Sequence, residues 1–180
     1  TSDGPAARPA VFNAGQVILG WCSLYDATRQ GRYVEASRRA GDWLLDMQDG
    51  DGAWRRGLSP LGTADPSPVR TYKSRVAWSL LELARLTGHE PYRDAALRNL
   101  DWVLAQQTEN CWFRNNSFSA RLDPLTHNIN YAIEGLLGSW HLCRDIRFLD
   151  AARGALEAQM RCFERAGRLG GSRHPVEVEP

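Results

Sequence analysis

The 180-residue sequence lacks several features that would place it at once in a large class of proteins. It contains no run of about 20 apolar residues, the length that a membrane-spanning helix needs, so no membrane span is expected. No charge sign dominates either, because 22 basic residues stand against 21 acidic ones and give a formal net charge of +1. Such a balance offers little to attract a polyanion, and nucleic acid is therefore not an expected partner.

Cysteine and histidine are too few and too scattered to form a metal or redox motif. The four cysteines contain no Cys-x-x-Cys pair, and three of them lie in apolar helical stretches, where a thiol behaves as a small hydrophobic group. They are Cys22, Cys111, Cys143 and Cys162. The four histidines show no paired spacing, so the sequence predicts neither a metal site nor a cofactor. The first nine residues lack the apolar core of a secretory signal, which favours a cytoplasmic location.

What the sequence does contain is an internal repeat. Residues 12–54 return as residues 72–113 at an offset of 59, and a weaker third copy covers residues 126–165. The matched positions are Tyr33, Trp43 and Gln48 with Tyr92, Trp102 and Gln107, and then Phe148 in the third copy. Apolar residues recur at helical spacing in two stretches per copy, and no stretch alternates long enough for a sheet. The sequence therefore predicts an all-α fold of three tandem helical hairpins.

These hairpins are expected to form one domain over residues 12–171, with tails at residues 1–11 and 172–180. The first helix of each pair is apolar over much of its circumference and the second is amphipathic, which indicates an inner and an outer layer. A hairpin cannot bury its apolar face alone, so three pairs in an arc leave two open flanks. We expect further hairpins of a longer chain to cover them, with self-association as the alternative. Long connections at residues 50–70 and 108–124 both emerge on one rim, and long loops tend to be functional.

Two stretches carry a resemblance to known families. Gln48, Gly52 and Trp54 resemble the Gln-Trp repeat of terpenoid cyclase and prenyltransferase toroids. Residues 13–16, 71–75 and 126–135 are similar to bacterial exopolysaccharide-cluster proteins, predicted six-hairpin toroids related to six-hairpin glycosidases and toroidal polysaccharide lyases. This resemblance covers residues 11–171 and implies about half of an α/α-toroid. Terpenoid cyclase activity is not expected, since no Asp-x-Asp-Asp string is present to hold a diphosphate through magnesium.

The catalytic candidates lie where the third inner helix begins. Aligning the copies places Phe12, Tyr72 and His127 at equivalent positions near one rim, and His127 and Tyr131 share a helical face because they are four residues apart. The resemblance to toroidal lyases implies that a histidine or tyrosine removes a proton next to a uronate carboxylate, which an asparagine or arginine neutralises. Histidine is suited to act as the base and tyrosine to return a proton. In the alternative interpretation, Thr126 caps the helix and both rings pack beneath the loop.

Hydrolysis would require two carboxylates roughly 5 to 10 Å apart. The candidates are Glu134, on the third inner helix, and Asp49 and Asp51, in a glycine-rich turn. Aspartates in such turns often bond only to nearby backbone amides. Glu134 faces either the interior of the ring or an arginine partner.

Aromatic faces and polar side chains near the rim are candidates for contact with a sugar. The set comprises Tyr72, Arg75, Arg114, Asn115, Asn116, Asn128, Asn130, Trp54 and Trp112. In the alternative interpretation, Trp54 and Trp112 fill the gaps between neighbouring hairpins. The sequence thus favours a carbohydrate-active toroid that acts on a polysaccharide or oligosaccharide as a lyase or epimerase. The alternatives are a non-catalytic module that binds polysaccharide or a partner protein, and a glycoside hydrolase.

Overall fold

The computed structural model describes residues 9–56, 70–118 and 123–167. Its elements are α1 (Val11–Thr28), α2 (Gly31–Met47), the short 3-10 helix η1 (Thr71–Lys73), α3 (Ser74–Thr87), α4 (Glu90–Leu104), α5 (Thr126–Cys143) and α6 (Ile146–Ala166). Apart from one isolated bridge between Gln107 and Phe113, these residues form no β-structure. The prediction of an all-α fold made of three hairpins is confirmed.

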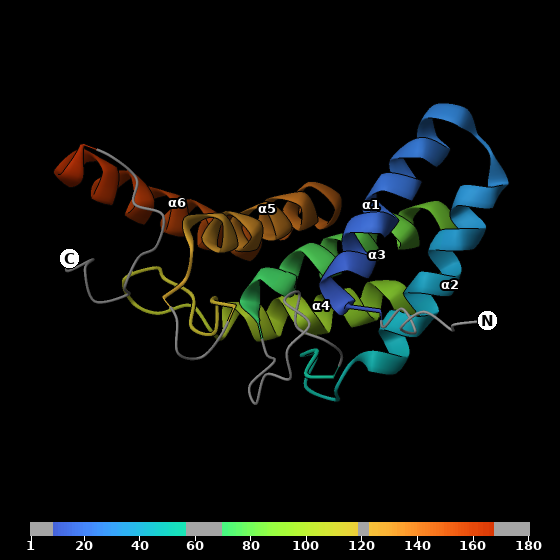
Figure 1. Cartoon of the computed structure of the whole chain (residues 1–180), viewed down its shortest axis with the longest axis horizontal. Helices are drawn as coiled ribbons and strands as arrows, with labels where there is room; N and C mark the ends of the chain where they lie inside the picture. Colours follow the sequence, from blue (N-terminus) through green and yellow to red (C-terminus); the bar gives the residue numbers. More distant parts are fainter. Residues whose placement is uncertain (1–8, 57–69, 119–122, 168–180) are drawn as a thin grey trace, which may run out of the picture.

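The hairpins stand in a row, with α1–α2 at one end, α3–α4 in the middle and α5–α6 at the other end (Figure 1). Helices α1, α3 and α5 pack side by side, whereas α2, α4 and α6 mainly contact their own hairpin partners. The first helices thus form the inner layer and the second helices the outer layer, as the difference in apolar character predicts. None of the helices in these described ranges combines the length and the apolar character that crossing a bilayer requires.

The turns inside the three hairpins share one geometry. Each inner helix ends at a residue in the left-handed conformation, Arg29, Gly88 or Arg144, whose amide donates back to a carbonyl of the last helical turn. Left-handed residues commonly end helices because they allow the last free carbonyls to accept hydrogen bonds. These three positions are separated by 59 and 56 residues, the same spacings as the sequence repeat.

A glutamine at the end of each of the first two outer helices ties one hairpin to the next. Gln48 Nε2 donates to the carbonyl oxygens of Gly52, at 3.0 Å, and Ala95, at 2.8 Å. Gln107 Nε2 donates in the same way to Cys111, at 3.3 Å, and Ala151, at 2.9 Å. One acceptor belongs to the glutamine's own loop and the other to the next outer helix. The glutamine of the Gln-Trp motif therefore fixes the distance between neighbouring hairpins.

The loops that follow Gln48 and Gln107 also correspond to each other, although the second loop has no glycine at the position of Gly52. Gly52 has φ +88°, and a Cβ there would lie 2.9 Å from the amide nitrogen of Asn99 and closer still to the Arg98 carbonyl. Cys111 occupies the equivalent position with φ +67°. The second loop thus keeps the left-handed turn without a glycine, at a cost in backbone strain.

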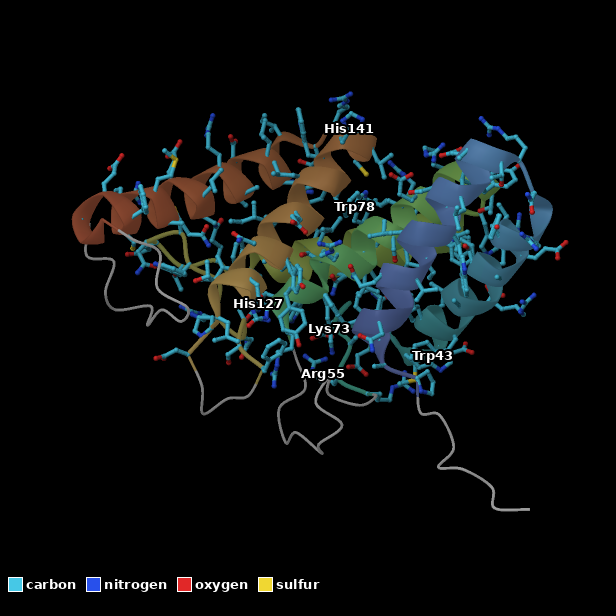
Figure 2. The ribbon with its side chains drawn as sticks, turned by 45° about the horizontal axis from the view of Figure 1, so that its top comes forward. Trp43, Arg55, Lys73, Trp78, His127 and His141 are labelled. Atoms are coloured by element: carbon cyan, nitrogen blue, oxygen red, sulfur yellow. The ribbon has the colours of Figure 1, made fainter. Side chains whose placement is uncertain are left out.

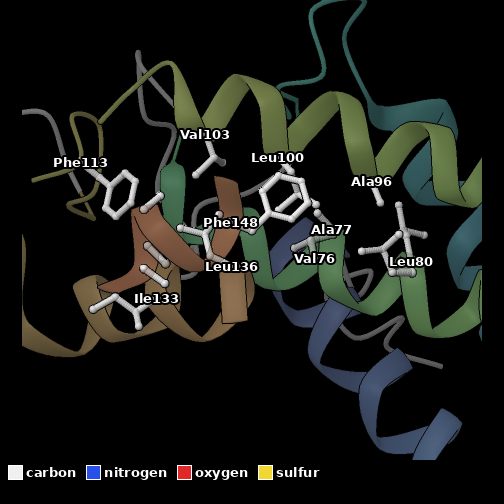
Figure 3. Packing of buried hydrophobic residues seen from close by; sticks show 14 of the residues in the cluster. Val76, Ala77, Leu80, Ala96, Leu100, Val103, Phe113, Ile133, Leu136 and Phe148 are labelled. Carbon is white, nitrogen blue, oxygen red and sulfur yellow. The ribbon is translucent and has the colours of Figure 1, made fainter. Parts of the chain in front are cut away.

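The core lies between the two layers and includes residues of all three hairpins. Figure 3 shows labelled members of it from the second and third hairpins. Tyr92 is 1% exposed, and its hydroxyl donates to Asp42 Oδ1 on the preceding outer helix at 2.5 Å. Phe148 is fully buried at the corresponding place in the third hairpin. Tyr33, their counterpart in the first hairpin, is only half-buried. This position, at which a hairpin meets the preceding one, is therefore buried in the second and third hairpins and partly open in the first, at the α1–α2 flank.

Candidate functional site

Five aromatic rings from distant parts of the chain meet where the inner helices begin. Phe12 on α1 lies 5.2 Å from Tyr72 on η1 and 5.2 Å from Tyr131 on α5, measured between ring centroids. Phe118 lies 6.0 Å from Tyr72 and 5.3 Å from His127. His127 and Tyr131 close the circuit at 5.6 Å. We call these five residues the rim cluster. Its edge-on and tilted ring pairs are the arrangements that aromatic quadrupoles favour.

A charged pair adjoins the rim cluster on the same face. The guanidinium of Arg75 lies 5.1 Å from the centroid of the Tyr131 ring, within the range of a cation–π contact. Its Nη1 donates to Glu134 Oε2, so α3 and α5 are joined by an ion pair. The Arg75 side chain is 20% exposed and that of Glu134 is 50% exposed. Of the two interpretations of Glu134, the structure shows the arginine partner.

The members of the rim cluster differ in their access to solvent. His127 is exposed and Tyr131 is half-buried, so both can reach a ligand, whereas Tyr72 is 1% exposed. Burial raises the pKa of Tyr72 to about 12, and the nearby Arg70 opposes this shift only in part. The Tyr72 hydroxyl therefore stays protonated at neutral pH and cannot act as a base. Within the rim cluster, the polar side chains that solvent can reach are those of His127 and Tyr131.

The helix cap proposed for this region comes from another residue. Leu125, not Thr126, is the N-cap of α5, and its backbone amide donates to Asn128 Oδ1 at 3.3 Å. Asn128 is fully buried in this role. His127 is exposed in the first turn of α5, and its ring contacts that of Phe118.

Several residues expected to contact a sugar lie in the core instead. Trp54 is 1% exposed, and its indole nitrogen donates to the Leu44 carbonyl at 2.9 Å. Trp112 and Asn116 are each 3% exposed. Their faces are unavailable to a ligand, and the two tryptophans belong to the hydrophobic core. We therefore place Trp54, Trp112, Asn116 and Asn128 outside the candidate site.

Three polar residues of the expected set remain at the surface. Arg114, Asn115 and Asn130 are exposed. The Thr71 backbone amide donates to the Asn115 carbonyl at 3.1 Å, and the Thr71 hydroxyl donates to the Arg114 carbonyl at 3.2 Å. These bonds hold the segment beside η1, so Arg114 and Asn115 lie near Tyr72.

Lys73 is a notable residue that sequence reasoning did not place in the site. It is the single lysine of the chain, is 7% exposed, and donates from Nζ to the Trp54 carbonyl at 2.7 Å. Burial, with a smaller contribution from Arg70, lowers the pKa of Lys73 to about 7, while Asp49 opposes the shift. Figure 2 shows Lys73 and Arg55 near the end of the inner layer where His127 lies. Nothing in the sequence around Lys73 indicates that this lysine is buried.

The two aspartates considered for hydrolysis are held by one arginine. Arg55 Nη1 lies 3.1 Å from Asp49 Oδ2, and Arg55 Nη2 lies 2.6 Å from Asp51 Oδ2. The hydrogen bond from Arg55 lowers the pKa of Asp51 to about 2, so this carboxyl is ionised at neutral pH. Asp51 also accepts from the Ala53 amide at 3.2 Å, which is the structural role that aspartate often has in turns. Among the described residues, no group of three or more His, Cys, Asp or Glu is placed to hold a metal ion.

No protein-family model matches this sequence, and neither does the sequence of any curated protein. Solved structures do match. A cellobiose 2-epimerase from Spirochaeta thermophila is similar with a TM-score of 0.77 and 13% identity, over 98% of this chain and 49% of that chain. A family 76 α-mannanase from Bacteroides thetaiotaomicron has a TM-score of 0.65 and 20% identity, over 89% and 47%. A D-mannose isomerase has a TM-score of 0.68 and 14% identity, over 89% and 42%.

The chain therefore spans about half the length of the solved structures that it matches. These structures have the α/α-toroid fold of six-hairpin glycosidases, and the three hairpins described here form a partial toroid of the same kind. The prediction of about half of an α/α-toroid is confirmed. At these levels of identity the similarity establishes the fold, and the chemistry has to be argued from the site.

Proposed function

We propose that this chain supplies one half of a carbohydrate-active toroid, which binds a polysaccharide or oligosaccharide at the rim cluster and moves a proton on it. One observation carries the proposal: the exposed His127 lies beside Tyr131, and Tyr131 lies under the guanidinium of Arg75. A base, a hydroxyl and a cation are thus gathered on one face. The sequence resemblance to exopolysaccharide-cluster proteins makes a bacterial polysaccharide the expected ligand.

Proton abstraction needs these three groups in distinct roles. The His127 imidazole takes a proton from the carbon next to a carbonyl or carboxylate group of the sugar, and negative charge then develops on the adjacent oxygen. The Arg75 guanidinium stabilises that charge. In an epimerase, a proton returns to the opposite face of the same carbon. In a lyase, the Tyr131 hydroxyl protonates the leaving oxygen while a double bond forms. Glu134 orients Arg75 through their ion pair.

The alternatives are supported less well. A glycoside hydrolase needs two carboxylates across the bond, but Asp49 and Asp51 are bound to Arg55, and only Glu134 lies near the rim cluster. A non-catalytic polysaccharide-binding module is favoured by one fact: Glu134 already neutralises the charge of Arg75. That module is our second candidate.

Deuterium exchange tests the proposal directly. The chain is incubated in D₂O with D-mannose, cellobiose and a uronate polymer, and the sugars are analysed by NMR for deuterium at the carbon next to the carbonyl or carboxylate. We expect exchange, and we expect His127→Gln to reduce its rate by roughly 100-fold or more, the usual contribution of a general base. His141→Gln is the matched control, because His141 is exposed on the same helix but about 20 Å away.

The result separates the candidates. Exchange that survives in the His127 variant shows that His127 is not the base. If a sugar shifts the backbone amide resonances of residues 127–134 but no deuterium enters, the non-catalytic module is correct. If no sugar produces exchange or shifts, the carbohydrate proposal fails.

A further inference from the structure

A pocket opens on the inner layer, away from the rim cluster. It lies between the C-terminal halves of α1 and α3 and has a volume of about 130 Å³. Its lining consists of Leu19, Cys22, Ser23 and Asp26 from α1 and Trp78, Glu82 and Arg85 from α3. We call it the α1–α3 pocket. It shares no residue with the rim cluster, and the proposed proton transfer does not use it.

One wall of the pocket is an aromatic ring that packs against a neighbouring helix. Trp78 is half-buried, and its indole packs against α5 at Gly138, where a Cβ would collide with the ring. A glycine at 138 is therefore what lets the ring fit between α3 and α5. Trp78 also lines the pocket. An indole at a pocket is the kind of group against which the apolar face of a pyranose ring packs.

The polar side of the pocket is ordered before any ligand arrives. Arg85 Nη2 donates to Asp26 Oδ2 at 2.5 Å, and Arg85 Nε donates to Glu82 Oε2 at 2.8 Å. The remaining carboxylate lone pairs can accept hydrogen bonds from sugar hydroxyls. Asp26 also pairs with Arg29, whose Nη1 lies 3.4 Å from Asp26 Oδ1, so two guanidiniums balance the two carboxylates. The pocket therefore has no excess positive charge to attract a uronate, and it suits a neutral sugar.

Cys22 gives the pocket an apolar floor. It is 2% exposed, and burial raises the pKa of its thiol to about 11. The thiol therefore stays protonated at neutral pH, and a covalent role for it has no support.

The pocket and the rim cluster are connected along α3. Arg75, which contacts Tyr131, also lies 5.8 Å from the centroid of the Trp78 ring. From Arg75 to Glu82 the helix advances seven residues, or about 10 Å. A single sugar at the rim cannot cover that distance, but an oligosaccharide lying along α3 can.

We propose that the α1–α3 pocket is a second sugar-binding position, which holds a neutral pyranose ring of an oligosaccharide whose other end lies at the rim cluster. The inference rests on the proposed function for the class of ligand. It adds that the ligand has several sugar units and that the unit in the pocket carries no carboxylate.

The test titrates the ¹⁵N-labelled chain with D-mannose, with α-1,6-linked mannotriose and with cellotriose, and follows the amide resonances. We expect D-mannose to shift residues 127–134. A trisaccharide should also shift residues 22–26 and the Trp78 indole N–H, and it should bind about tenfold more tightly. Ser23→Phe fills the pocket and should remove that gain while leaving D-mannose binding unchanged. Ala27→Phe, an exposed position on α1 outside the lining, is the control.

A second variant guards against an unintended effect of the bulky ring. Glu82→Gln preserves the shape of the pocket but changes its charge and acceptors, and should weaken trisaccharide binding only. Shifts confined to residues 127–134 with both trisaccharides overturn the pocket and leave the rim proposal standing. Shifts confined to residues 22–26 and Trp78 support sugar binding in the pocket and overturn the rim proposal. Unchanged trisaccharide affinity in Ser23→Phe overturns the pocket.

Discussion

At Gly135 the backbones of α5 and α3 approach closely, and replacing this glycine is the sharpest test of the packing. At Gly135 an added Cβ would lie 2.5 Å from the Arg75 amide nitrogen and closer still to Ser74. Real Cβ atoms do not approach backbone so closely, so α5 would have to move away from α3. Overpacking of this kind costs about 1 to 3 kcal/mol, and more when backbone rather than a flexible side chain must shift.

The substitution also brings a gain, which has to be subtracted. Alanine is favoured over glycine inside a helix by about 1 kcal/mol. For Gly135→Ala we therefore expect a net loss of about 2 kcal/mol in the free energy of unfolding. In a chain of this size that corresponds to a Tm lower by roughly 4 to 8 °C.

Gly20 on α1 provides the matched control. It also lies inside an inner helix, but no atom approaches within 4 Å of an added Cβ. Gly20→Ala should therefore stabilise the protein by up to about 1 kcal/mol. Both variants are measured by urea and thermal unfolding, followed by circular dichroism. If Gly135→Ala is as stable as Gly20→Ala, the close contact between α3 and α5 is not present in solution.

Three further predictions concern other parts of the fold. Gly52 has φ +88°, and an added Cβ would collide with the Arg98 carbonyl, so Gly52→Ala should lower the free energy of unfolding by about 2 kcal/mol or more. Gly88 has φ +66° and open space around it, so Gly88→Ala should lower it by only about 1 kcal/mol. Equal losses would show that the collision at Gly52 does not occur. The pKa of Lys73 is about 7 in the folded chain and 10.5 when the side chain is not buried. Between these pH values the unfolded chain binds more protons than the folded chain, so the contribution of Lys73 to the free energy of unfolding rises from pH 7 to pH 10.5. At pH 6.5, Lys73→Met should therefore be more stable than the parent by about 3 to 5 kcal/mol, less the contribution of the lost hydrogen bond to Trp54. This advantage should shrink by pH 9.5. A difference in urea unfolding that does not change with pH would show that Lys73 does not titrate in this range. An exposed apolar stripe on α6, formed by Leu156, Met160 and Phe163, predicts that the chain self-associates. In sedimentation experiments Met160→Arg should raise the dissociation constant of the self-associated form about tenfold, whereas Glu157→Lys, on the adjacent face, should not. A chain that is monomeric at every concentration would rule out self-association.

The repeat made most of the architecture predictable. The offsets of 59 and 56 residues, visible in matched aromatic and glutamine positions, reappear as the spacing of the left-handed turns and of the glutamine bonds between hairpins. The first repeat begins at Phe12, one residue after the start of α1 at Val11. Cys111 stands where the first loop has Gly52, and the second loop keeps the left-handed turn.

The candidate site was predictable in part. His127 and Tyr131 share a face because of their spacing alone, and the alignment of the copies placed Tyr72 near them. The pairing of Arg75 with Glu134 joins residues 59 positions apart on different helices, and the sequence offered it only as one of two possibilities. Lys73 was overlooked, because nothing local distinguishes a buried lysine from an exposed one.

By itself the sequence determined the helices, their order and the two layers, since these depend on periodicity and on short-range turn chemistry. The tertiary structure decided which polar and aromatic side chains face solvent. Trp54, Trp112 and Asn128 share their residue types with plausible sugar contacts, yet they are buried because neighbouring hairpins close over them. The α1–α3 pocket likewise exists only because the fold brings together lining residues of two helices that are more than 50 positions apart in sequence. Periodicity fixes the face on which a side chain lies, but the packing of other helices against that face decides whether a ligand can reach it.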